Sequence, residues 1–380
     1  MGFSFEDRFY SDGGRPVTSK AQQSSVSEKN DRSDLMHGLA CPDCRGPLSL
    51  TEKISCRVCN REWLVIDGIP HFVEKFPYWG EMPLQQMQEV NRLSDAGSWR
   101  AALRESPDPV VRKAAEMILN VERANWQWLL DLPPQSRVLD VGAGTGTNSH
   151  GLGMHYQEVV ALEPVLERVQ FMQKRFAQEK LSNVKVVRSS LWTLPFEPES
   201  FDLVAMNGVL EWVASGEIGD PRELQQKALK NMFGLLRPGG ALYIGIENRI
   251  CPEYFVGYAD PHCGLPYVTV LPRPLAQLFA TRKGQNGYRN YLYSSGGYRK
   301  LLEEVGFTDV VIYAAEASYN HPRFYVPLKN NIFSYYSRNF DPMRSSRFRG
   351  FVRTALLNLG LAKYLTDSYA IVARKREAKL

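Results

Sequence analysis

The sequence predicts an α/β protein in which a seven-stranded, mainly parallel sheet carries helices on both faces, with a small metal-binding module in front of it. Three observations support this fold class. The apolar run at Val138, Leu139 and Val141 stops at Gly142, Gly144 and Gly146, as a buried strand does when it ends in a tight turn. Short apolar runs then alternate with helix-length segments, as βαβ units require. Two CxxC pairs precede all of these runs.

Length and composition limit the class of protein. The 380 residues suffice for two modules and a substantial core. A formal net charge of +5 is too small to indicate nucleic acid or an anionic membrane by itself. No apolar run has the roughly 18 residues of a membrane span, and the N-terminus lacks a hydrophobic signal core. We therefore expect a cytoplasmic protein without a transmembrane segment; the sequence leaves its oligomeric state open.

Composition divides the chain into four parts. Residues 1–36 are polar and poor in apolar side chains, so we expect a disordered leader. Residues 37–75 hold the CxxC pairs, and residues 76–132 show helical periodicity. The sheet and its helices are expected over residues 133–380.

Four of the six cysteines form the two CxxC pairs, Cys41 with Cys44 and Cys56 with Cys59. Each CxxC turn directs two thiolates to one point, and two such turns complete a tetrahedral four-sulfur site. So small a segment has little core of its own, so the metal would supply much of its folding free energy. The spacing predicts zinc; an iron–sulfur site and a redox dithiol pair are the alternatives.

The segment 76–132 has apolar side chains at helical spacing. They are expected on one face of a helix, and they are Ala114, Met117, Ile118, Val121 and Trp128. We favour a packing stripe that joins the metal module to the sheet. The alternative is a lid over a bound cofactor.

The strands of the sheet follow from apolar runs between turn residues. A turn at Leu236–Gly240 precedes the fifth strand, and a helix over Ser295–Val305, stopped by Gly306, precedes the sixth. The seventh strand, Ser368–Arg374, is expected as an antiparallel edge. The seven expected strands are 137–141, 158–162, 184–187, 201–206, 241–246, 309–313 and 368–374.

The glycine turn after the first strand indicates a nucleotide-type site. Glycines permit positive φ and let the backbone approach a ligand closely. No lysine–serine pair follows the turn, which argues against a P-loop. Glu163 ends the second strand, ~20 residues beyond the turn, where a carboxylate can accept hydrogen bonds from both ribose hydroxyls of an adenosine.

Over Arg137–Glu247 the sequence resembles the class I S-adenosylmethionine-dependent methyltransferases. The resembling stretches are LDVGAGTG, the acidic strand end at Glu163, LPFEPESFDLV, GVLEWV and LRPGGALYI. The resemblance implies a Rossmann-like methyltransferase sheet and S-adenosyl-L-methionine as cofactor. It also implies a set of cofactor-binding residues, namely Asp140, Gly142, Gly144, Gly146, Glu163, Ser190, Leu191 and Asn207.

Within that set, Asp140 is expected to contact the amino group of the cofactor. The family usually has an aspartate after the third strand, where it binds the adenine amino group. This sequence has Ser189 and Ser190 there, so a neutral hydroxyl would replace a carboxylate. Leu191 and Trp192 are expected to enclose the base, or else to belong to the core.

The cysteine segment resembles the small zinc-ribbon activator protein that partners methyltransferases of tRNA, rRNA and release factor, through CPDCRGPL, CRVC and IDGIPHF. In that family the ribbon stabilises the enzyme and takes no part in the chemistry. The resemblance therefore implies a structural zinc ribbon at Cys41, Cys44, Cys56 and Cys59.

The acceptor is expected beyond the carboxyl ends of the strands, where open α/β sheets bind ligands. An insertion at about 248–294 lies there. His262, beside Asp260 in a proline-stiffened loop, is the best candidate base; Glu211 follows the fourth strand and is either a base, a substrate contact or a solvated helix carboxylate. The expected substrate-binding residues in the insertion are Asn248, Arg249, Tyr267, Arg273 and Arg289, of which the arginines suit an anionic group.

A second insertion, at about 314–366, carries an apolar stripe that includes Phe348, Phe351 and Val352 near Arg347 and Arg349. We favour an amphipathic helix packed on the sheet; a membrane surface or RNA phosphates are the alternatives.

Three functions remain open. The leading hypothesis is an S-adenosylmethionine-dependent methyltransferase acting on an oxygen or nitrogen of a small metabolite, sugar or lipid-linked glycan. The first alternative is a tRNA or rRNA base methyltransferase, because of the ribbon; nucleic acid is possible as a partner but not favoured. The second is a non-catalytic scaffold that retains the fold and the ribbon.

Overall fold

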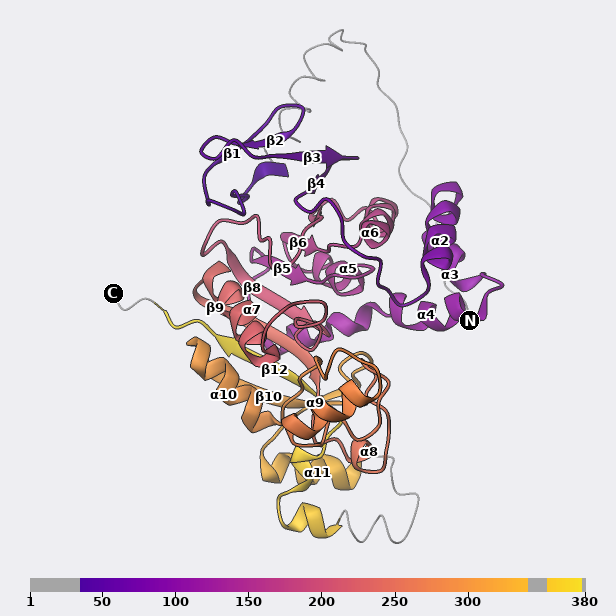
Figure 1. The fold of residues 1–380 in the computed structure, drawn as a ribbon, viewed down its shortest axis with the longest axis vertical. Coiled ribbons are helices and arrows are strands. Elements are labelled where there is room, and N and C mark those ends of the chain that lie inside the picture. The colour runs from indigo at the N-terminus through magenta and orange to yellow at the C-terminus, as the bar shows by residue number, and fades with distance from the viewer. Residues whose placement is uncertain (1–34, 341–353, 378–380) are drawn as a thin grey trace, which may run out of the picture. The chain divides into compact units, whose positions relative to one another are not determined.

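The computed structural model describes residues 35–340 and 354–377. The chain divides into a short unit, residues 1–37, and a large unit, residues 38–380. The expected leader therefore lies outside the described residues except for its end, as does the stripe at Phe348, Phe351 and Val352 with Arg347 and Arg349. The large unit contains a small antiparallel sheet, a helical segment and a large mixed sheet (Figure 1).

The small sheet comes first in the large unit. Its four strands pair in chain order and antiparallel, and they are β1 (Leu48–Leu50), β2 (Ile54–Cys56), β3 (Glu62–Ile66) and β4 (Ile69–His71). Its interior is minimal: Ile54 and Cys41 are fully buried, whereas β3 alternates exposed and half-buried residues. This sheet has too little apolar interior to fold by hydrophobic burial alone.

The small sheet is hydrogen-bonded to the segment that follows strand β7 (Val184–Val187). Arg188 donates its amide to the Pro70 carbonyl and accepts from the Phe72 amide, both at 2.9 Å. Ala40 donates to the Pro195 carbonyl at 3.0 Å, and Arg45 Nη1 donates to the Leu194 carbonyl at 2.8 Å. These bonds hold residues 188–196 from both ends.

The helical segment contains α2 (Leu84–Ala96), α3 (Trp99–Arg104), α4 (Pro109–Ile118) and the 3₁₀ helix η1 (Val121–Leu129). Ser98 and Asp108 cap α3 and α4 through their side-chain oxygens. The expected single stripe is wrong at its end: Ala114 and Ile118 are buried, but Trp128 is 64% exposed. A 3₁₀ helix has three residues per turn, so Trp126 faces inward instead and stacks on Tyr243 at 3.7 Å.

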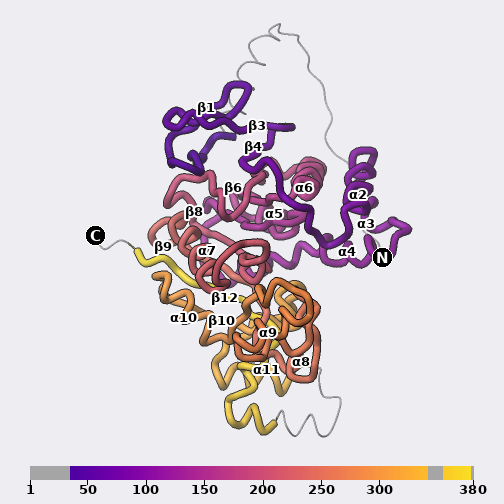
Figure 2. The backbone as a smooth tube through the Cα atoms, in the orientation of Figure 1, coloured from indigo at the N-terminus to yellow at the C-terminus, as the bar shows by residue number. Residues whose placement is uncertain are grey.

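The large sheet has eight strands in the order β11-β10-β12-β9-β8-β5-β6-β7. Strands β5 to β9 are parallel to one another, and β12 runs antiparallel between β9 and β10. Figure 2 traces the backbone through β6, β8, β9, β12 and β10. Besides β7, the strands are β5 (Arg137–Val141), β6 (Glu158–Leu162), β8 (Phe201–Asn207), β9 (Leu236–Glu247), β10 (Thr308–Glu316), β11 (Phe324–Pro327) and β12 (Ser368–Arg374).

Two expectations about this sheet are wrong. The count is eight rather than seven because the second insertion folds back as a hairpin strand, β11, on β10. The expected edge strand β12 is antiparallel but interior, because it pairs with both β9 and β10, and β11 forms the edge. The expected turn at Leu236–Gly240 is drawn into β9 as an irregularity: Gly239 has φ 80°, and the register against β8 shifts between Phe201 and Leu203.

The remaining helices flank the strands. Helix α10 (Ser295–Val305) has the expected bounds and ends at Gly306 with φ 112°, and it packs on α7 (Pro221–Leu235). The others are α5 (Thr147–Gly153), α6 (Leu166–Gln178), α8 (Pro252–Phe255), α9 (Arg273–Arg282), α11 (Asn330–Asn339) and the 3₁₀ turn η2 (Ala362–Tyr364). Within the described ranges, every helix is too short or too polar to cross a membrane.

Candidate active site

The glycine turn follows β5 at the carboxyl end of the parallel strands. Gly142, Gly144 and Gly146 have φ of 65°, 59° and 76°, values that L side chains adopt rarely. A Cβ on Gly142 would lie 2.9 Å from Val209, and one on Gly146 would lie 2.7 Å from Phe176. Both conformation and space therefore require glycine at these positions.

Glu163 lies directly after β6 and is buried, with 2% of its surface exposed. Its Oε2 accepts a hydrogen bond from the Gly144 amide at 2.8 Å, and its Oε1 accepts one from the Val165 amide at 3.1 Å. Burial raises its pKa, although the charge of Arg168 opposes this. Each oxygen keeps a second lone pair, so Glu163 braces the turn and can still accept a hydroxyl of a ligand.

Asp140 lies within β5, one residue before the strand ends, and is also buried. The Ser149 hydroxyl donates to its Oδ2 at 2.6 Å. Burial raises the pKa of Asp140 to about 6 even so. The ionised form of Asp140 is therefore poorly solvated, and a bound cation would stabilise it.

Arg123, on η1, is a cofactor-site candidate that the sequence reasoning missed. Its Nε is buried without a hydrogen-bond partner, and Nη2 donates to Asn320 Oδ1. The charge of Asp140 acts on it, and no ion pair within 4 Å involves it among the described residues. Its position five residues beyond a helix gave no signal in the sequence.

The segment before α2 lies beside the glycine turn. Glu81 forms an ion pair with Arg168 at 2.9 Å, and a Cβ on Gly144 would lie 3.4 Å from Glu81. Trp79 packs on Trp212 with ring centroids 4.7 Å apart, and Trp212 in turn packs on His262 at 4.8 Å. This geometry favours the lid alternative for the start of segment 76–132.

The expected adenine side, after β7, is engaged in local turns. Ser190 Oγ accepts from the Trp192 amide at 3.2 Å, and Ser189 donates its hydroxyl to the Thr193 carbonyl. The Leu191 carbonyl accepts from Asn231 at 3.3 Å, which leaves the half-buried side chains of Ser190 and Leu191 for a base to contact. Adenine binding by these residues stays a prediction.

Beyond β8 and β9 the structure gathers Glu211, Glu247 and His262, which we call the acid–histidine cluster. One ligand atom from each lies within 4.8 Å of the others. His262 Nε2 is 3.8 Å from Glu211 Oε1 and 3.6 Å from Glu247 Oε1. On its other side, His262 Nδ1 donates to Asp260 Oδ1 at 2.9 Å, so His262, Asp260 and Glu211, the three predicted catalytic residues, are brought together.

The ionisation of the cluster reflects its burial. Burial, and then the charge of Glu247, raise the pKa of Glu211 to about 8; burial also raises the pKa of Glu247. Burial would lower the pKa of His262, but the hydrogen bond to Asp260 and the charges of Glu247 and Glu211 raise it to about 9. Burial would likewise raise the pKa of Asp260, and its bond with His262 lowers it.

Two findings here correct or extend the sequence reasoning. Glu211 is not a solvated helix carboxylate: it lies in a turn and is completely buried. Glu247 was not predicted as a site residue, although it ends a parallel strand, which is where such sheets bind ligands. Tyr319, also unpredicted, donates its hydroxyl to Glu247 Oε1 at 3.1 Å.

Asn207 ends β8 next to this cluster. Its Oδ1 accepts from the Tyr243 hydroxyl at 3.3 Å, while its buried Nδ2 has no hydrogen-bond partner. Asn207 can therefore donate to a ligand between the glycine turn and the cluster.

Most of the predicted substrate-binding residues use their polar groups within the protein. Asn248 donates to the Tyr364 and Thr366 carbonyls, Arg249 to those of Thr269 and Leu271, and Arg289 to three carbonyls of residues 214–219. Arg273 stacks on Tyr291 at 3.9 Å with a buried, unpartnered Nη1, and Tyr267 is 47% exposed. Their contact with a substrate stays a prediction.

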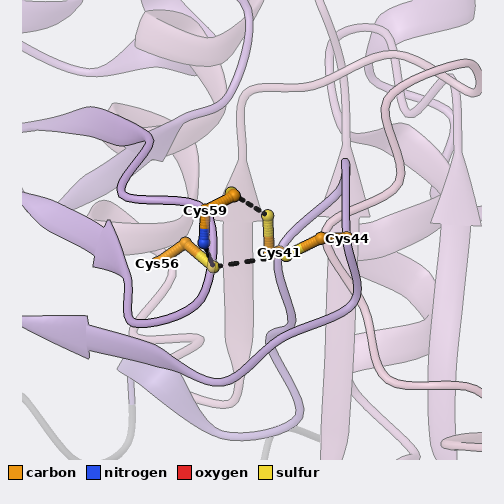
Figure 3. A group of neighbouring side chains, drawn as sticks. All are labelled: Cys41, Cys44, Cys56 and Cys59. Carbon is orange, nitrogen blue, oxygen red and sulfur yellow. Dashed lines mark hydrogen bonds between the residues drawn. The ribbon is translucent and has the colours of Figure 1, made fainter.

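The four cysteines of the small sheet form a second group, the four-cysteine cluster (Figure 3). Cys41 Sγ is 3.6 Å from Cys59 Sγ, and Cys44 Sγ is 3.4 Å from Cys56 Sγ. A tetrahedral ion with bonds of about 2.3 Å separates its sulfurs by a little under 4 Å. The backbone amides of Cys59 and Val58 lower the pKa of Cys56 to about 6, which favours the thiolate that a metal needs. The cluster is compatible with a zinc ribbon.

The sequence was compared with known families, proteins and structures. Residues 139–244 match the family described as methyltransferase domain. The biotin biosynthesis bifunctional protein BioHC of Cellvibrio japonicus is 27% identical over 216 residues, 55% of this chain and 39% of that protein. The ubiquinone biosynthesis O-methyltransferase of Coxiella burnetii is 28% identical over 173 residues, 43% of this chain and 64% of that protein.

Among solved structures, phosphoethanolamine N-methyltransferase 2 of Haemonchus contortus has a TM-score of 0.39 and 14% identity, covering 69% of this chain and 53% of that one. The chain spans less than two thirds of the length of either curated relative. The family match supports a methyltransferase domain of the class I, S-adenosylmethionine-dependent type over residues 139–244.

Proposed function

We propose that this protein transfers a methyl group from S-adenosylmethionine to an oxygen of a small molecule, with a nitrogen acceptor as the alternative. The observation that carries the proposal is that two sites lie at the carboxyl ends of the parallel strands. The glycine turn with Glu163 follows β5 and β6, and the acid–histidine cluster follows β8 and β9. Strand β8 pairs directly with β5, so a donor and an acceptor can meet there.

The residues on the cofactor side fit S-adenosylmethionine group by group. Glu163 accepts the ribose hydroxyls, Asp140 pairs with the methionine ammonium, and the guanidinium of Arg123 pairs with its carboxylate. Such a ligand would give the Arg123 Nε a hydrogen-bond partner. It would also stabilise the ionised form of Asp140, whose pKa is raised by burial. When bound, S-adenosylmethionine supplies a methyl group on a sulfonium.

On the acceptor side, the acid–histidine cluster takes the proton. The sulfonium methyl group would be the electrophile, and the acid–histidine cluster would take the proton that the acceptor oxygen loses on methylation. Asp260 orients His262, while Trp79 and Trp212 exclude water from the reacting atoms. The similarity to the Coxiella O-methyltransferase supports oxygen as the acceptor atom.

We further propose that the four-cysteine cluster holds zinc in a purely structural ribbon. The module that carries it is hydrogen-bonded to residues 188–196, and that segment precedes all three residues of the acid–histidine cluster in the sequence. No residue of the ribbon enters the acid–histidine cluster.

Calorimetric titration with S-adenosylmethionine and S-adenosylhomocysteine tests the cofactor half. We expect one site per chain; absence of binding at hundreds of micromolar would reject a methyltransferase and leave a scaffold. Transfer of a radiolabelled methyl group to hydroxylated aromatics, sugars and lipid-linked glycans tests the acceptor half. Label that enters RNA and none of the small molecules would overturn our proposal in favour of a nucleic-acid acceptor.

A further inference from the structure

The acid–histidine cluster is assembled from three separate segments of the chain. Glu211 comes from the turn after β8, Glu247 is the last residue of β9, and His262 belongs to the loop that follows α8. The separations of 3.6 Å and 3.8 Å from His262 Nε2 to the two carboxylates are longer than hydrogen bonds. The three groups converge at ion-pair distance but form no hydrogen bond to one another.

Three of the four carboxylate oxygens of the cluster lack a hydrogen-bond partner within the part of the chain that the structure describes. Both oxygens of Glu211 and Oε2 of Glu247 are buried and accept no hydrogen bond, and Glu211 is 0% exposed. Buried polar atoms in folded proteins are nearly always satisfied, and an unpaired buried carboxylate is among the most costly exceptions. Three such atoms facing one imidazole nitrogen indicate a cationic ligand.

The histidine is oriented for coordination. Asp260 accepts from His262 Nδ1 at 2.9 Å, and Asp260 is itself held by the hydroxyls of Thr269 and Tyr288, each at 3.0 Å. This network fixes the ring so that Nε2 lies toward the two glutamates, where a divalent ion would take the place of the Nε2 proton. Metal-binding histidines are usually fixed in this way by a carboxylate behind them.

We propose that Glu211, Glu247 and His262 bind a divalent cation, with remaining positions open to the acceptor oxygen. Two carboxylates match the charge of a divalent ion, and bonds of about 2.0–2.2 Å place neighbouring ligand atoms about 3–4 Å apart, as observed here. Two oxygens and one imidazole favour Mn²⁺ or Mg²⁺ over thiolate-seeking metals. This inference rests on the proposed function, because the ion would bind the acceptor hydroxyl, promote loss of its proton to a free carboxylate oxygen, and so prepare the oxygen for methylation.

Binding of Mn²⁺ to the full-length protein, followed by the loss of the free-ion electron paramagnetic resonance signal, tests this site without cofactor or acceptor. We expect one Mn²⁺ per chain. Glu211→Gln and Glu247→Gln should each weaken binding at least tenfold, whereas Glu253→Gln, an exposed carboxylate on α8, should leave it unchanged. Cys44→Ser should also retain Mn²⁺, since soft thiolates do not form this site.

Absence of Mn²⁺ binding to the wild type at millimolar concentration would overturn the inference. Unchanged affinity in Glu211→Gln, in protein that still binds S-adenosylmethionine as the wild type does, would overturn it as well. Methyl transfer that is independent of divalent ions, with no Mn²⁺ bound, would refute the ion and keep the proposed function. Mn²⁺ binding that Glu211→Gln abolishes, in a protein that does not bind S-adenosylmethionine, would support the ion and refute the function.

Discussion

The four-cysteine cluster and the acid–histidine cluster are both groups of ligand atoms, yet they are built in opposite ways. The cysteines come from two short turns within 19 residues of chain, whereas Glu211, Glu247 and His262 come from three elements around two strands of the large sheet. The first cluster lies in a module that has little hydrophobic core of its own. The second is buried inside one and leaves three carboxylate oxygens unpartnered. We infer that the first stabilises the fold and that the second is maintained for chemistry at a cost in stability.

The largest expected effect tests whether the four-cysteine cluster stabilises the fold. Cys56→Ser should abolish zinc binding and unfold residues 38–72, because structural zinc sites contribute roughly 10 kcal/mol or more to such small modules. Metal analysis and hydrogen exchange of the ribbon measure both outcomes. Cys263→Ser, outside the cluster, should keep one zinc per chain. A ribbon that stays protected without zinc would contradict us.

The second prediction concerns the other cluster. His262→Ala should lower turnover by about 10²–10⁴-fold, the usual contribution of a group that handles a proton at the reacting centre, and change the affinity for S-adenosylmethionine little. Turnover and calorimetry on the same preparation separate the two. The exposed His155 provides the matched control, and His155→Ala should behave as the wild type. Equal losses in both variants would remove the assigned role.

The third prediction concerns the glycine turn and Glu163. This site is formed by residues close in sequence, as the four-cysteine cluster is, but it is buried, as the acid–histidine cluster is. Glu163→Gln should weaken S-adenosylmethionine binding about 10–100-fold, since charged hydrogen bonds contribute roughly 1.5–3 kcal/mol. Calorimetry should show Glu167→Gln, four residues further along, close to wild type. If Glu163→Gln binds normally, the carboxylate only braces Gly144.

The smallest expected effect is a pH dependence. Burial raises the pKa of Asp140 to about 6 in the free protein, and pairing with an ammonium favours the ionised form. Affinity for S-adenosylmethionine should therefore be full above pH 6 and fall by up to about tenfold per pH unit below it. Asp140→Asn should flatten that part of the curve while it lowers the plateau. An unchanged pH profile in this variant would assign the dependence to another group, such as Glu163.

Local features of the sequence predicted local features of the structure. The strands β5, β6, β7 and β12 have the expected bounds because each is a mainly apolar run between turn residues. The helix α10 has the expected bounds because its apolar side chains lie on one face and Gly306 ends it. The meeting of His262 with Glu211 was expected only in outline, from their places beyond the strand ends. Glu247, Arg123 and Tyr319 could not be predicted as site residues, because strand pairing and side-chain burial bring them to the site from separate elements; Tyr319 and Glu247, for example, are 72 residues apart. The predicted number of strands was wrong because β11 forms by pairing with β10 and has no strand pattern of its own in the sequence.

The hydrogen bonds from Ala40 and Arg45 to the carbonyls of Pro195 and Leu194 tie the ribbon to the loop that carries Ser190 and Leu191. Cysteine thiolates are the atoms that peroxides attack first. An oxidant that releases the zinc would therefore loosen this loop and reduce cofactor occupancy while every residue of the acid–histidine cluster stays chemically intact. Under the proposed function, zinc loss from the ribbon would thereby lower methyl transfer through the cofactor site alone.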